Sequence, residues 1–116
     1  SAYQPVVENV YWSNGVETSY NGWNRTAFVN CYQASSITFD RLTGYSGLPD
    51  GNYSIFVNRN GQYLSTLRAN TDEEQSTTNA HKVFNVPEGA FAFSISESAA
   101  QITRFTDGTY KVTPNA

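Results

Sequence analysis

The chain has 116 residues, a net charge of −3 at pH 7 and a pI near 4.9, which are the dimensions of one acidic domain. Only seven Lys and Arg are present and they form no run, which argues against nucleic-acid binding because phosphate contacts need clustered basic side chains. No apolar run approaches the roughly 20 residues of a membrane span, so we expect no membrane insertion.

Short runs of alternating apolar and polar residues follow one another along the chain, with the period of two that half-buried strands have. Residues 1–6 include a Pro and few apolar anchors, so we expect an N-terminal arm or linker, followed by a single domain over residues 7–116. The predicted strands are 7–13, 16–20, 26–32, 36–42, 53–58, 62–67, 82–86, 91–96, 101–105 and 109–113. The polar window 71–80 has no apolar face and is interpreted as a long loop.

Tight-turn signals separate these strands. Asn14-Gly15, residues 49–52 (PDGN), Asn60-Gly61 and Asp107-Gly108 are residue types that tolerate the positive φ of hairpins. The pattern predicts an all-β fold, an antiparallel sandwich or barrel. The predicted core comprises Val29, Cys31, Ile37, Phe39, Ile55, Val57, Val86, Phe91, Phe93, Ile95 and Val112. Cys31, the lone cysteine, is expected to be a buried thiol.

Motifs of catalysis are missing from the sequence. There is no Gly-x-Ser-x-Gly elbow, no phosphate loop and no His/Cys group with metal-ligand spacing, and His81 is the one histidine. Asp50 and Asp107 are explained by turn chemistry. A glycoside hydrolase in which two of the ten acidic residues converge on the glycosidic bond remains an alternative. The loop 70–74 could supply oxygen ligands to calcium, but it is interpreted as a solvated charged loop. We therefore expect no enzyme, no cofactor and no bound metal.

Aromatic residues gather in the first 45 residues, beside several amides and one guanidinium. The rings are Tyr11, Trp12, Tyr20, Trp23, Tyr32 and Tyr45, and the polar neighbours are Asn14, Asn21, Asn24, Arg25 and Asn30. Rings stack on the C–H faces of pyranoses, while amides and Arg bond hydroxyl groups in fixed directions. Packing of the same rings into the core is the competing interpretation. Tyr11 and Trp12 are consecutive, so at most one of them points inward.

Three segments resemble, in the same order, a recurrent pattern in known β-sandwich modules. They are 22–29 (GWNRTAFV), 56–65 (FVNRNGQYLS) and 84–95 (FNVPEGAFAFSI). The pattern is similar to that of carbohydrate- or receptor-binding modules of phage tail, baseplate and fibre proteins and of bacterial surface proteins. The resemblance implies a jelly-roll-like two-sheet β-sandwich, displayed on a virion or cell exterior and often facing glycans. Phe93 and Ser94 stand where those modules often have an Arg, so no ligand contact is carried over.

The leading hypothesis is a non-enzymatic module that recognises cell-surface carbohydrate for adhesion or host attachment. Trp23, Tyr20 and Tyr45 are the predicted stacking rings, with Asn24 and Arg25 as polar partners. A shallow site with a millimolar constant contributes only about 4 kcal/mol, so stable attachment calls for several copies, and we expect a homo-oligomer or a larger surface assembly.

Two alternatives remain open at the level of sequence. The first is a structural capsid or fibre component that uses the same surface to bind other virion proteins, and it predicts one contiguous apolar patch. The second is an accessory domain of a larger secreted enzyme.

Overall fold

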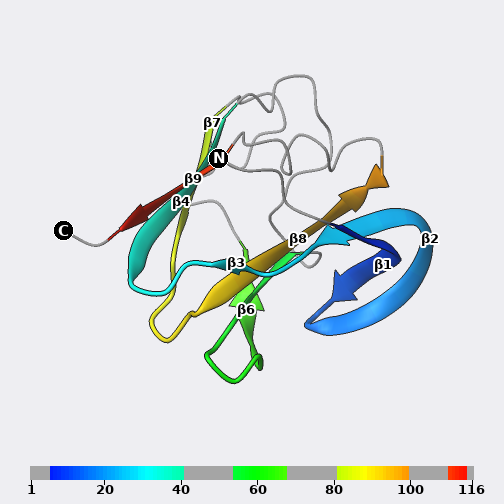
Figure 1. Cartoon of the computed structure of the whole chain (residues 1–116), viewed down its shortest axis with the longest axis horizontal. Coiled ribbons are helices and arrows are strands. Elements are labelled where there is room, and N and C mark those ends of the chain that lie inside the picture. The colour runs from blue at the N-terminus through cyan, green and yellow to red at the C-terminus, as the bar shows by residue number, and fades with distance from the viewer. Residues whose placement is uncertain (1–5, 41–53, 68–80, 100–109, 115–116) are drawn as a thin grey trace.

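The computed structural model describes residues 6–40, 54–67, 81–99 and 110–114, and these residues form an all-β fold of antiparallel strands (Figure 1). The strands are β1 (Val6–Ser13), β2 (Val16–Thr26), β3 (Val29–Asn30), β4 (Ala34–Asp40), β5 (Ser54–Val57), β6 (Tyr63–Thr66), β7 (His81–Asn85), β8 (Ala92–Ser98) and β9 (Tyr110–Pro114). No helix among the described residues is long and apolar enough to cross a membrane.

The strands form two sheets. Six strands make the larger one, in the order β1-β2-β8-β5-β6 with β3 also paired to β8, and three make the smaller one, in the order β7-β4-β9. Every pairing is antiparallel. β8 is the common partner of β2, β3 and β5, so it is the central strand of the larger sheet.

The main core lies between the two sheets. Phe56 and Phe93 are cross-strand partners on β5 and β8, with ring centroids 6.4 Å apart, and Ile37 and Phe84 are partners on β4 and β7. Together with their neighbours these side chains form one buried cluster. Its members are Cys31, Ala34, Ile37, Phe56, Leu67, Phe84, Ala90, Phe93 and Ile95, with Val29 and Val86 packed against it.

The opposite face of β5 and β8 is covered by the β1–β2 hairpin. Trp12 of β1 packs with Ile55, Val57 and Ala92, which lie on the side of the sheet away from Phe56 and Phe93 because strand residues alternate between faces. The hairpin tip reaches β6, where Gly15 meets the ring of Tyr63. β5 and β8 are therefore buried on both faces, and Figure 1 shows β2 curving strongly to allow this.

Most predicted strands inside the described residues are confirmed, including the hairpins at Asn14-Gly15 and at 60–61. An unbroken strand over 26–32 is wrong, because β2 continues to Thr26 and the chain leaves β3 for a turn at 32–33. Val6 already belongs to β1. The strand at 101–105, the loop at 71–80, the turns at 49–52 and 107–108, and residues 1–5 lie outside the described residues.

The predicted core is also largely confirmed. Six of its members are buried: Cys31, Ile37, Ile55, Val57, Phe93 and Ile95. Val29 and Val86 are partly buried and pack against the main cluster, and Phe91 packs against the cluster around Trp12. Ile55 and Val57 were expected on the same face as Phe93 but lie on the opposite face of the sheet, under the hairpin. The side chains of Phe39 and Val112 lie outside the description.

Candidate functional site

The β1–β2 pair is interrupted by a bulge at Asn9. Glu8 pairs with Asn24 and Val10 pairs with Ser19, so Asn9 alone on β1 stands opposite residues 20–23 of β2. Asn9 has a left-handed backbone, with φ of 61°, which an Asn tolerates better than most residues. The longer strand bends here, and residues 20–22 are paired with neither neighbouring strand, whereas Trp23 is the partner of Ser98 on β8.

Two asparagine side chains close this bulge. The backbone N–H of Asn9 donates to Asn24 Oδ1 at 3.2 Å, and Asn9 Oδ1 accepts a hydrogen bond from the backbone N–H of Gly22, also at 3.2 Å. These side chains replace the ladder hydrogen bonds that the bulge removes. The bulge is thus a built feature of the hairpin that fixes where Tyr20 and Trp23 point.

Three rings meet beside the bulge, and we call Tyr11, Tyr20 and Trp23 the aromatic cluster. Tyr11 lies 5.4 Å from Tyr20 and 5.9 Å from Trp23 between ring centroids, and Tyr20 lies 6.2 Å from Trp23. All three contacts are edge-to-face, with interplanar angles of 60–64°, a geometry that aromatic pairs favour. Tyr20 is 54 % exposed, so the cluster is open to solvent.

Arg25 is engaged elsewhere. Its Nε donates to Glu17 Oε2 at 2.6 Å and its guanidinium lies 4.9 Å from the centroid of Trp12 and 5.6 Å from that of Phe28. Trp12 and Tyr11 are consecutive in a regular part of β1 and therefore point to opposite faces. The structure places Arg25 with Trp12 and the aromatic cluster with Tyr11, and it does not bring Arg25 together with Tyr20 and Trp23.

Of the other predicted site residues, Asn24 lies beside the cluster and Tyr45 does not belong to the described part of the chain. Asn24 is adjacent to Trp23 on β2 and holds the bulge through its Oδ1, while its Nδ2 has no partner within the described part of the chain. Tyr11 belongs to the cluster, although sequence reasoning did not select it as a site residue. The signal that could have found it is alternation with Trp12, because one of the two had to point away from the core.

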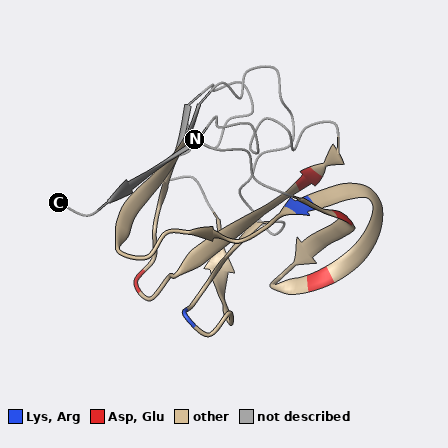
Figure 2. Ribbon diagram, viewed as in Figure 1, with Lys and Arg blue, Asp and Glu red and all other residues tan. Residues whose placement is uncertain are grey.

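The described residues hold little reactive chemistry. Burial raises the pKa of the Cys31 thiol to about 11, so it stays protonated and is a poor nucleophile at neutral pH. No group of three or more His, Cys, Asp or Glu that could hold a metal occurs among them. The acidic and basic positions that Figure 2 colours are few and scattered over separate strands and turns. The loop 70–74, considered for calcium, lies outside the description.

No known protein family, curated protein or solved structure matches the chain.

Proposed function

We propose that the chain is a non-enzymatic carbohydrate-binding module whose site is the aromatic cluster on the β1–β2 hairpin. One observation carries the proposal. The hairpin's packing on the sheet is made by Trp12, which is 7 % exposed, whereas Tyr20 remains 54 % exposed. Packing of the core, the competing explanation for an aromatic-rich hairpin, accounts for Trp12 and leaves Tyr20 unexplained.

The chemistry of the cluster suits a sugar ring. Each ring is held by edge-to-face contact with the other two, so its orientation is set before a ligand arrives and little side-chain freedom is lost on binding. Tyr20 presents aromatic surface for the C–H face of a pyranose, and Trp23 forms the wall beside it. The Nδ2 of Asn24, next along β2, is a donor for a sugar hydroxyl group.

Charge favours an uncharged glycan. The one described cation on this hairpin, Arg25, is neutralised by Glu17 in an ion pair. A site for a polyanion would need free basic side chains around the rings. The proposed ligand is accordingly a neutral saccharide of a cell surface.

The proposed module acts in several linked copies on a surface. One shallow site supplies millimolar affinity, worth about 4 kcal/mol, so several linked copies are needed for attachment. A jelly-roll-like sandwich that is exposed on a virion or cell exterior, as a homo-oligomer or within a larger assembly, is the context that we propose for the module.

A structural role in virion assembly is the second candidate, because the same hairpin exposes Val16 at 64 % and Val7 at 38 %. Exposed aliphatic side chains beside aromatic ones can form a protein interface. This candidate predicts binding to a protein and not to glycans.

The test is a glycan array probed with the purified protein clustered on a multivalent carrier. We expect selective binding that Tyr20→Ala and Trp23→Ala each remove while the circular dichroism spectrum is kept. The matched control is Phe28→Ala, a ring with 43 % exposure that contacts Trp12 and Arg25 and lies outside the cluster. Array binding that is equally weakened by all three variants, or a silent array with well-folded protein, would overturn the proposal.

A further inference from the structure

A pocket of about 510 Å³ lies away from the aromatic cluster, between the turn that joins β3 to β4 and the turn that joins β7 to β8. Its volume falls in the roughly 300–1,000 Å³ range of small-molecule sites. The lining residues come from 32–35 on one side and 85–90 on the other. In Figure 1 these turns lie on the side of the molecule opposite the β1–β2 hairpin.

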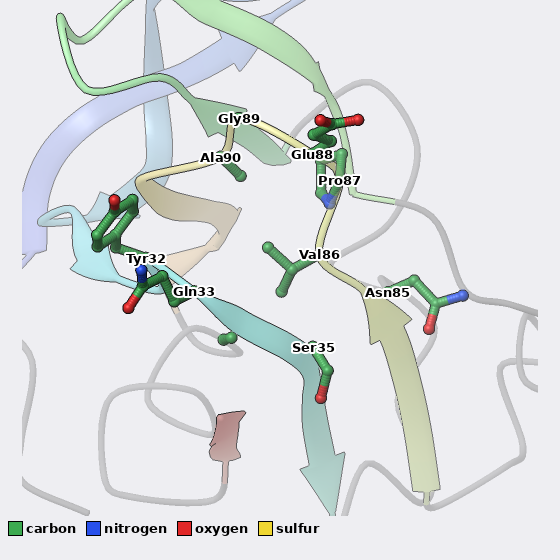
Figure 3. Close-up of a pocket in the computed structure, with 10 residues that line it drawn as sticks. Tyr32, Gln33, Ser35, Asn85, Val86, Pro87, Glu88, Gly89 and Ala90 are labelled. Atoms are coloured by element: carbon green, nitrogen blue, oxygen red, sulfur yellow. The ribbon is translucent and has the colours of Figure 1, made fainter. Parts of the chain in front are cut away.

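The centre of the pocket is apolar and its edges are polar. Figure 3 shows Val86 and Ala90 directed into the hollow, whereas Asn85 and Glu88 point outward from it. Ala34 and Ala90 are also members of the main core cluster, so the floor of the pocket is the rim of the core. A ligand here would set a small apolar group against the floor and its polar groups at the edge.

The aromatic wall of the pocket is held in place. The ring centroid of Tyr32 lies 5.7 Å from that of Phe91, with the two planes tilted by 39°, and the guanidinium of Arg59 from the β5–β6 turn lies 4.7 Å from the centroid of Tyr32. The backbone N–H of Tyr32 donates to Asn30 Oδ1 at 2.9 Å, which fixes the start of the turn. The ring is therefore positioned before any ligand is present, as in preorganised sites.

Gln33, beside that wall, has a backbone conformation that its residue type disfavours. Its φ is 61°, at the third position of a turn closed by a 3.0 Å hydrogen bond from the Ala34 N–H to the Cys31 oxygen. Gly or Asn is the residue that such a position favours, and the other two non-Gly residues with positive φ among those described are asparagines. A residue kept in an unfavourable conformation at the edge of a pocket points to a use for its side chain.

We propose that this pocket is a second saccharide site, selective for an N-acetylated hexosamine. The acetamido methyl group fits the floor between Val86 and Ala90, and the sugar ring extends outward against Tyr32. The Gln33 amide, which Figure 3 shows on the Tyr32 side and directed away from Val86, bonds the polar groups of the sugar at this outer edge. The choice of a sugar rests on the proposed function, whereas the position, the apolar floor and the Gln33 backbone do not. Two sites on opposite sides of one chain would let a single copy join two glycans.

The experiment is a titration of the ¹⁵N-labelled full chain with N-acetylglucosamine and, separately, with glucose, followed by amide chemical shifts. N-acetylglucosamine should shift the amides of residues 32–35, Val86 and 88–90, and glucose should shift them far less because it lacks the acetamido group. The Tyr20→Ala variant should keep these pocket shifts while it loses any shifts on the hairpin. The two sites are thereby read independently, and failure of one is distinguishable from failure of the other.

Gln33→Gly tests the role of the side chain. We expect about five- to tenfold weaker N-acetylglucosamine binding, the value of one hydrogen bond, with a thermal midpoint that is unchanged or higher because the backbone is relieved. Asn14→Gly is the matched control, since Asn14 also has positive φ but lies in the distant β1–β2 turn, and its affinity should be unchanged. Unshifted pocket amides, equal shifts with both sugars, or Gln33→Gly binding as tightly as the parent would each overturn the proposal.

Discussion

The two faces of the central strand β8 are packed in different ways. On the face toward the smaller sheet, Phe93 and Ile95 join a cluster of large apolar side chains. On the face toward the hairpin, β8 presents Ala92, Ser94 and Ser96, and one large side chain, Trp12, covers them. The first face is stabilised by the burial of large apolar side chains. The second is covered mainly by the indole of Trp12, which packs on small residues.

Hydrogen bonds fix the position of the hairpin on β8. Ser94 Oγ accepts from Trp12 Nε1 at 2.8 Å and donates to the Thr26 carbonyl oxygen at 2.7 Å. Ser96 Oγ accepts from the backbone N–H of Trp12 at 3.0 Å, and Thr26 Oγ1 accepts from the Ile95 N–H at 3.1 Å. Apolar packing tolerates sliding, whereas a satisfied buried network specifies one position. The hydrogen bonds therefore fix the orientation of the hairpin on the sheet as well as its attachment. This orientation also sets the position of the aromatic cluster.

We expect the two tryptophans to differ most in their contribution to stability. Trp12→Ala should lower the free energy of unfolding by about 3–5 kcal/mol, the usual cost of removing a buried large aromatic side chain. Trp23→Ala should lower it by about 1 kcal/mol, because Trp23 is only partly buried and loses its edge-to-face contacts with Tyr11 and Tyr20. Urea denaturation monitored by far-UV circular dichroism measures both. Equal losses would show that the aromatic cluster is core and not surface.

The next effect concerns the contact of the hairpin tip with β6. Gly15 has φ of 86°, and a Cβ there would overlap the Tyr63 ring, with Cδ1 at 2.7 Å. Gly15→Ala should destabilise by about 2 kcal/mol or more, since the left-handed backbone of an L-residue alone costs about 1–2 kcal/mol. The control is Gly61→Ala, which has φ of 78° and no neighbour within 4 Å of an added Cβ. Matching losses in thermal unfolding would mean that the tip does not press on Tyr63.

A smaller effect probes the hydrogen-bond network. Thr26→Val keeps the shape of a side chain that is 1 % exposed but leaves the Ile95 N–H without its acceptor, so we expect a loss of about 1–3 kcal/mol. Thr18→Val on the outer part of the same strand removes only an exposed bond to the Val16 carbonyl and should change stability by about 0.5 kcal/mol or less. Equal effects in urea denaturation would contradict a directional role for the network.

The last prediction concerns the Cys31 thiol in the core between the two sheets, and its effect appears only at alkaline pH. Burial raises the pKa of Cys31 to about 11, above that of an unfolded thiol, so the folded state holds this proton more tightly. The resulting stabilisation is present at neutral pH and should be lost as the pH rises from about 9 to about 11. Subtracting the unfolding free energies of Cys31→Ala from those of the parent, pH by pH, isolates this group from titrating Tyr and Lys. A flat difference would contradict the prediction.

The sequence predicted the strands and turns well wherever local physics decides them. Period-two alternation identified β4, β5, β6 and β8, and the Asn-Gly pairs marked the hairpin turns, because alternation and positive φ are local properties. It did not reveal that β2 extends to Thr26 or that the strand expected at 26–32 is divided. The Asn9 bulge depends on Asn24 and Gly22 of the facing strand, so no short window of sequence contains its cause. The left-handed Gln33 lies in the short turn 31–34, but Gln is not a residue type that marks such a position.

The candidate site divides in the same way. From the sequence alone it follows that aromatic and amide side chains are frequent in the first hairpin and that Tyr11 and Trp12 face opposite sides. The packing of the folded chain is what puts Trp12 in the core position with Arg25 against it, and what brings Tyr20 and Trp23 to Tyr11 on the other side. The reason is that a side chain's burial depends on what lies across from it. For this hairpin that is the row of small residues on β8, some eighty positions further along the chain.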